Sequence, residues 1–140
     1  MYDRLIAITY LFAALDLAGA TADQALAVPV GARFAKVLDV QAVLTEAVVG
    51  TTSPAILNVG TSANASLMAT LSIPNGAAIG SVHNSRSAGF SHNGVYQADA
   101  EGSEQDTLLL SITDPTGGTP AGTANVSIVI GYDQANPLLG

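Results

Sequence analysis

The chain has no cysteine and no tryptophan, and only four of its 140 residues are lysine or arginine. Without cysteine it can form neither a disulfide nor a zinc–thiolate or iron–sulfur site. The four bases are dispersed, and eleven acidic residues give a net charge of −7. Such a balance disfavours binding to nucleic-acid phosphates and to anionic membrane surfaces. We therefore expect neither nucleic acid nor a membrane as a partner.

Charged residues of both signs are scarce, at 11% of the chain, whereas soluble domains have about 25%. The apolar fraction of 49% is ordinary. Since monomers usually cover their surface with charged side chains, this chain either has a surface rich in Ser, Thr and Asn or hides surface against partners. We therefore expect a homo-oligomer, with a trimer as the expected state.

Short apolar segments separated by Gly, Pro and Asn predict an all-β fold. The length fits a single domain over residues 1–140, with an apolar N-terminal strand or arm and connection (1–24), a sandwich core (25–132) and a C-terminal tail (133–140). The predicted strands number about eight, as in a jelly-roll-like β-sandwich. They are expected at residues 4–12, 25–30, 34–44, 55–59, 66–73, 107–113 and 124–132, with a further short strand near residues 95–96.

Alternation of apolar and polar residues predicts which side chains face the core. Two late strands show it most clearly, and a third, earlier strand shows it with Asp39 and Gln41 on the opposite face. The side chains expected to face inward are Phe34, Leu38, Val40, Ala42 and Leu44, then Leu108, Leu110 and Ile112, and finally Val126, Ile128, Ile130 and Tyr132.

The N-terminal segment is apolar on both faces, so a strand there must be covered twice. A helix continuing to Leu17 is the alternative, because apolar residues also recur at helical spacing; Ile, Thr and Tyr favour the strand. A signal peptide is disfavoured because Asp3 accompanies Arg4 and Asp16 interrupts the apolar run. We expect this segment to form a partner interface. Its candidate residues are Tyr2, Leu5, Ile6, Ile8, Tyr10 and Phe12.

Residues 83–104 are polar and rich in Gly, Ser and Asn, and they predict a long surface loop. His83 and His92 lie in it, but their spacing is not that of a helical metal site. A Ser/His/Asp catalytic triad could be assembled from these histidines with Ser81, Ser85 or Ser91 and Asp99. However, the sequence contains no G-x-S-x-G motif. We therefore expect no enzyme activity, no cofactor and no metal site.

An acidic cluster, made of Asp99, Glu101, Glu104 and Asp106, follows this loop. Carboxylates with an intervening glycine can bind Ca²⁺, but the spacing matches no EF-hand. A solvated acidic turn is the favoured interpretation, and it would offer an electrostatic patch to a basic partner. Whether the cluster holds an ion is left open by the sequence.

Four segments together resemble a known family. They are VPVGARFAKVLDV (28–40), SPAILNVGTS (53–62), ATLSI (69–73) and GTANVSIVIGY (122–132). This order, a P-x-G-A-R turn leading into a strand, an LNVGTS strand and turn, and a glycine-led final strand, resembles the small β-sandwich decoration or cement proteins of tailed-bacteriophage capsids. The resemblance spans about residues 25–132 and contains no chemical motif.

The resemblance implies a virion structural protein on the outer capsid surface, a homotrimer that bridges subunits of the major capsid protein and stabilises their lattice. It implies no catalytic residues. A tail, baseplate or fibre-associated structural module is an alternative. A carbohydrate-binding or adhesin module is a further alternative, although it would need exposed aromatic rings to stack on sugars.

Overall fold

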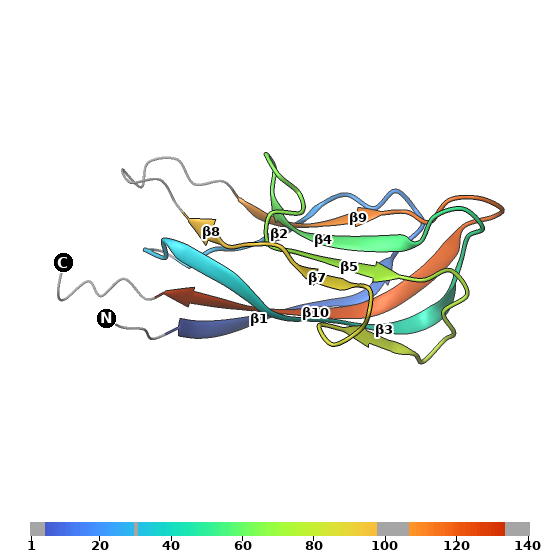
Figure 1. The fold of residues 1–140 in the computed structure, drawn as a ribbon, viewed down its shortest axis with the longest axis horizontal. Helices are drawn as coiled ribbons and strands as arrows, with labels where there is room; N and C mark the ends of the chain where they lie inside the picture. The colour runs from blue at the N-terminus through green and yellow to red at the C-terminus, as the bar shows by residue number, and fades with distance from the viewer. Residues whose placement is uncertain (1–4, 30, 98–106, 134–140) are drawn as a thin grey trace.

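The computed structural model describes residues 5–29, 31–97 and 107–133, and the regular structure within them is entirely β-strand. Within these ranges, ten strands form two antiparallel sheets that face each other as layers (Figure 1). The first sheet contains, in spatial order, β1 (Leu5–Asp16), β10 (Ala121–Asp133), β3 (Phe34–Val49) and β6 (Val82–Asn84), with β8 (Tyr96–Gln97) also beside β3. The second contains β2 (Gln24–Leu26), β9 (Leu108–Thr113), β4 (Ala55–Thr61), β5 (Ala69–Ile73) and β7 (Phe90–His92).

The order of the strands within the two sheets is that of a jelly roll. Both β6 and β8 pair with β3, so they can be counted as one interrupted strand, and β7 is an addition at the edge of the second sheet. The strands that remain are then β1-β10-β3-β6 in one sheet and β2-β9-β4-β5 in the other. Renumbered from 1 to 8 along the chain, their orders are 1-8-3-6 and 2-7-4-5. This is the double Greek key of a jelly-roll sandwich. The predicted all-β sandwich is therefore confirmed.

Within the predicted loop and at its start the structure has three short strands, β6, β7 and β8. The strand expected near residues 95–96 corresponds to β8, whereas β6 and β7 were not predicted. β6 pairs with β3, β7 with β5, and β8 with the start of β3. Side-chain hydrogen bonds fix the turns between them: the Ser85 hydroxyl donates to the Asp39 carboxylate at 2.7 Å, and the Asn84 amide donates to the Ser87 hydroxyl at 2.9 Å. Such polar strands have no apolar period for a sequence pattern to detect. The rest of the predicted loop, residues 98–104, lies outside the described residues.

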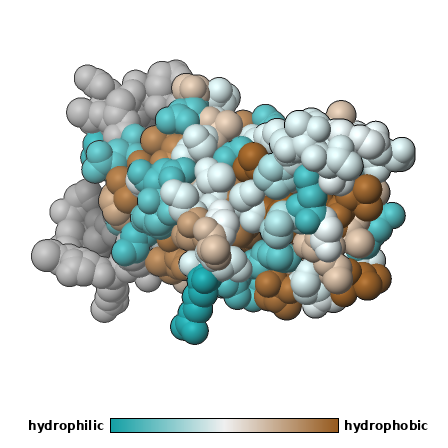
Figure 2. Space-filling view, turned by 45° about the vertical axis from the view of Figure 1, so that its right-hand side comes forward, coloured by the Kyte–Doolittle hydropathy of each residue, from teal (hydrophilic) through white to brown (hydrophobic). Residues whose placement is uncertain are grey.

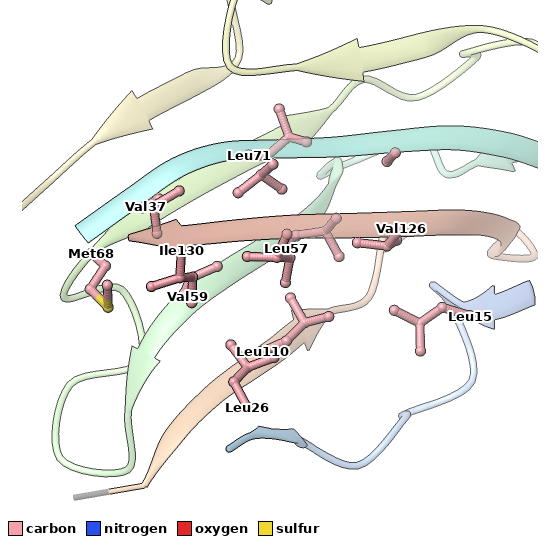
Figure 3. Packing of buried hydrophobic residues seen from close by; sticks show 14 of the residues in the cluster. Leu15, Leu26, Val37, Leu57, Val59, Met68, Leu71, Leu110, Val126 and Ile130 are labelled. Carbon is pink, nitrogen blue, oxygen red and sulfur yellow. The ribbon is translucent and has the colours of Figure 1, made fainter. Parts of the chain in front are cut away.

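The core lies between the sheets and is built mainly from alternate residues of the longer strands (Figure 3). The inward facing predicted for β9 and β10 is confirmed: Leu108, Leu110 and the four β10 side chains are buried, and Ile112 packs against them. Burying a side chain of this size contributes about 1.5–3 kcal/mol. The β10 residues concerned are Val126, Ile128, Ile130 and Tyr132.

The facing predicted for the first half of β3 is wrong. Leu38 is 42% exposed, and Val37 is buried in its place. The register against β10 shifts at this point, because Val37 pairs with Ile130 while Asp39 pairs with the adjacent Val129. Leu38 is thus the extra residue of a β-bulge, which moves the preceding residues by one position and reverses their facing. Beyond the bulge the prediction holds, and the buried residues are Val40, Ala42 and Leu44.

Candidate interaction surface

The N-terminal segment forms β1, a long strand at the edge of the first sheet, which confirms the strand over the helix. Among the described residues, β1 pairs with β10 on one side, and its other side has no paired strand (Figure 1). The remaining sheet edges consist of strands of two or three residues: β6 and β8, β2, and β7. An unpaired edge presents a row of backbone N–H and C=O groups that can hydrogen-bond to another chain.

The two faces of β1 have different surroundings. Ile8, Tyr10 and Phe12 lie opposite core residues of β10 and pack against the core. On the other face, Thr9 is exposed and Leu11 is 76% exposed. Half of the six candidate interface residues therefore also stabilise the domain itself. Of the other three, Ile6 is 42% exposed, whereas Tyr2 and the side chain of Leu5 lie outside what the structure describes.

Tyr10 attaches β1 to two neighbouring segments. Its hydroxyl donates to the carbonyl oxygen of Ala27 at 2.5 Å. Its single proton is thereby used, so the Tyr132 hydroxyl, 2.6 Å away, donates to Tyr10. Burial raises the pKa of Tyr132 well above its usual range, and the proton that it donates to Tyr10 raises it further. Burial also raises the pKa of Tyr10. Both groups therefore remain protonated at neutral pH.

A β-bulge ends the regular part of β1. The register against β10 shifts between Phe12 and Leu15, and Ala14 has a φ of 51°. This is the left-handed region, where a residue with a Cβ is strained by about 1–2 kcal/mol. The Asn125 side chain compensates, since its Oδ1 accepts a hydrogen bond from the Ala14 amide at 2.9 Å. Residues 5–12 are thus the regular edge of the sheet.

Exposed apolar side chains are concentrated on the first sheet. All six large apolar side chains that the described residues expose belong to it or to the loop leading into β6. Figure 2 shows the apolar residues of one face as separate brown patches among white and teal, more hydrophilic ones. Separate patches suit a contact made of several small pieces better than one large docking site. The six residues are Ile6, Leu11, Leu38, Val49, Ile79 and Val82.

The histidines do not form a shared site within the part of the chain that the structure describes. His83 lies on β6 in the first sheet, whereas His92 is exposed on β7 in the second. The Ser81 hydroxyl lies 3.1 Å from Nε2 of His83. Burial lowers the pKa of His83, so its ring is neutral at pH 7. Ser85 and Ser91 bond elsewhere, at 2.7 Å to Asp39 and 2.6 Å to Asn93.

No group of three or more His, Cys, Asp or Glu side chains suited to a metal ion occurs among the described residues. Asp99, Glu101, Glu104 and Asp106 lie outside them, so the interpretation of the acidic cluster as a solvated turn stays a prediction. The described part of the chain also contains no helix with the length and hydrophobicity needed to cross a membrane.

The LNVGTS segment (57–62), which carried part of the family resemblance, has a structural role. It forms most of β4 and the turn that follows. The Thr61 amide donates to the Asn64 carbonyl at 2.9 Å, and the Asn64 amide donates to the Thr61 hydroxyl at 3.1 Å. A Cβ on Gly60 would collide with the backbone carbonyl oxygens of Asn64 and Ala65. Glycine is therefore required at position 60 because the turn folds back against the strand.

Comparison with known proteins gives one structural similarity. No protein-family model matches the chain, and no curated protein matches it. Among solved structures, a chain described as "Cyanophage Pam1 capsid asymmetric unit" is similar with a TM-score of 0.41 and 14% sequence identity, over 94% of this chain and 84% of that one. A TM-score below 0.5 does not establish a shared fold, so the function proposed below depends on the chain itself.

Proposed function

We propose that this chain is a structural protein of a virus particle, which binds the outer surface of a bacteriophage capsid and stabilises its lattice. The observation that carries the proposal is a jelly-roll sandwich whose long edge strand has no charged side chain over residues 5–15, and whose exposed large apolar side chains lie on one sheet or on the loop leading into β6. The jelly roll occurs in viral capsid domains, but a fold does not by itself define a function. The surface is therefore the stronger support, together with the resemblance of segments 28–40, 53–62, 69–73 and 122–132 to capsid decoration proteins.

Two surfaces are assigned roles in this proposal. The N-terminal segment, residues 2–12, joins copies of the protein or contacts the capsid protein. The polar segment 83–104 faces outward, away from the shell. Copies associate, with a trimer as the proposed state on the shell, and each copy contacts neighbouring capsid subunits. Weak contacts repeated over a lattice reinforce one another, because each bound site raises the effective concentration for the next.

A carbohydrate-binding function is less well supported, although lectin domains also use the jelly roll. Sugar recognition needs aromatic rings at the surface. None of the six aromatic side chains that the structure describes is exposed. Tyr96 and Tyr132 are buried, and the others are half-buried: Tyr10, Phe12, Phe34 and Phe90. A tail or baseplate module remains the alternative, and the shell-binding experiment distinguishes it.

The test is rebinding to capsids that lack the protein. Purified wild-type protein should cosediment with such capsids to saturation. Leu11→Asp, which places a charge on the exposed face of β1, should bind less, because either role of this segment needs an apolar contact. Arg86→Ala, in the polar segment, serves as the control and should bind normally. Saturable binding to tails instead of capsids would favour the alternative module.

A further inference from the structure

We propose that the free edge of β1 pairs with the same strand of a second copy, antiparallel and around a two-fold axis. This inference concerns the isolated protein and does not depend on the proposed capsid function. Its starting point is the length of this edge. β1 has 12 residues, of which 5–12 are regular, whereas the strands at the other sheet edges have three residues or fewer. Short edge strands protect a sheet from adding strands, and β1 lacks that protection.

The charge distribution indicates that the partner strand is itself uncharged. The chain has a net charge of −7, but residues 5–15 include no charged side chain. Two copies can therefore approach along this edge without placing like charges opposite each other, which would destabilise a strand pair. The net charge of −7 otherwise makes two copies repel each other.

The sequence of β1 is also self-complementary in one register. If Thr9 lies on the two-fold axis, the numbers of two opposite residues add up to 18. The core-facing side chains of one copy then lie beside the core-facing side chains of the other. Ile6 then lies opposite Phe12 and Ile8 opposite Tyr10, which are aliphatic–aromatic cross-strand pairs of the favourable kind. On the outer face, Leu11 lies opposite Ala7. The pairing would thus cover parts of Ile6 and Leu11, two of the exposed apolar side chains.

This symmetry sets the number of copies. A contact of each copy with the identical surface of another is two-fold, the commonest symmetry of oligomers, and cannot by itself close a ring of three. The isolated protein therefore contains an even number of copies. That number is two if β1 makes the only contact, and six if a separate surface also joins three copies.

A cysteine test is possible because the chain has none of its own. In Thr9→Cys, the two introduced residues would face each other across the axis with Cα atoms about 4.5–5.5 Å apart, a distance that a disulfide spans. Mild oxidation should convert most of the protein into a covalent dimer. The matched control is Thr113→Cys, on an exposed position at the end of β9, and it should stay unlinked.

Charges introduced at position 9 test whether the partner is a second copy. Thr9→Lys and Thr9→Asp should each halve the mass measured by light scattering, because like charges meet at the axis, with circular dichroism unchanged. An equimolar mixture of the two should recover the wild-type mass. Thr113→Lys should leave the mass unaltered. A wild-type monomer or trimer at micromolar concentration, or a Thr9→Lys protein of unaltered mass whose Thr9→Cys counterpart does not crosslink, would overturn the proposal.

Discussion

The hydroxyl groups of Tyr10 and Tyr132 lie 2.6 Å apart and connect the first strand to the last on the core side of the sheet. The Tyr10 hydroxyl also donates a hydrogen bond to the carbonyl oxygen of Ala27, in the segment after β2. The edge strand is thus fixed to the domain by side-chain hydrogen bonds as well as by backbone pairing. This explains how a strand with one free edge keeps a defined position.

Tyr10→Phe should destabilise the domain by about 1–3 kcal/mol, because the buried Tyr132 hydroxyl and the Ala27 carbonyl lose their partner. Chemical denaturation measures this as a lower free energy of unfolding. In the double variant Tyr10→Phe/Tyr132→Phe the loss should be smaller than the sum of the single losses, since the two residues share one bond. Additive losses would mean that the bond does not stabilise the fold.

High pH should weaken the domain. The pKa of Tyr132 in the folded state lies above its unfolded value of about 10, so the folded state holds its proton more tightly. This stability is fully present below pH 10 and is lost as the pH rises above it. Thermal unfolding between pH 8 and 11 should show the decline, and Tyr132→Phe should make it shallower. An equally steep decline in that variant would assign the effect to other groups.

Ile128→Asp should unfold the domain, because a buried and unpaired carboxylate costs several kcal/mol or more. Ile128 is fully buried at the centre of β10. Asn125→Asp on the same strand is the control: position 125 is exposed, and the carboxylate still accepts the bond from the Ala14 amide. Circular dichroism and thermal melting measure both variants. A normal melting curve for Ile128→Asp would contradict the facing of β10.

Alternation along the chain was enough to predict the sandwich and the core faces of β9 and β10, because every second residue of these strands faces the core over most of their length. It failed at Leu38, where a bulge that depends on pairing with β10 shifts the facing by one residue. Of the three short strands within 82–97, the one near residues 95–96 was predicted. The other two, β6 and β7, have no apolar period, and side-chain bonds such as Ser85 to Asp39 hold the turn between them. Of the predicted interface, Ile8, Tyr10 and Phe12 were correctly recognised as apolar, but their packing on the core depends on contacts with β10, more than 100 residues away.

Gly60→Ala should cost about 1–3 kcal/mol, because the added Cβ meets two backbone carbonyls that cannot move without disturbing the turn after β4. Gly76→Ala separates this steric effect from backbone strain, since a Cβ at position 76 would meet open space although φ there is +87°. At Gly76 the left-handed backbone alone should cost about 1–2 kcal/mol. The loss at Gly60 should be at least as large, although φ at Gly60 is not positive. Unfolding by urea measures both. An unchanged free energy of unfolding for Gly60→Ala would contradict the close approach.

The proposal that this protein reinforces a viral shell is tested most directly by heating capsids with and without it. Capsids stripped of the protein should release their DNA, detected with an intercalating dye, at a lower temperature than intact ones. Adding wild-type protein should restore the higher release temperature, and adding Leu11→Asp at the same concentration should restore it less. An unchanged release temperature, together with no cosedimentation of the wild-type protein, would contradict the proposed function.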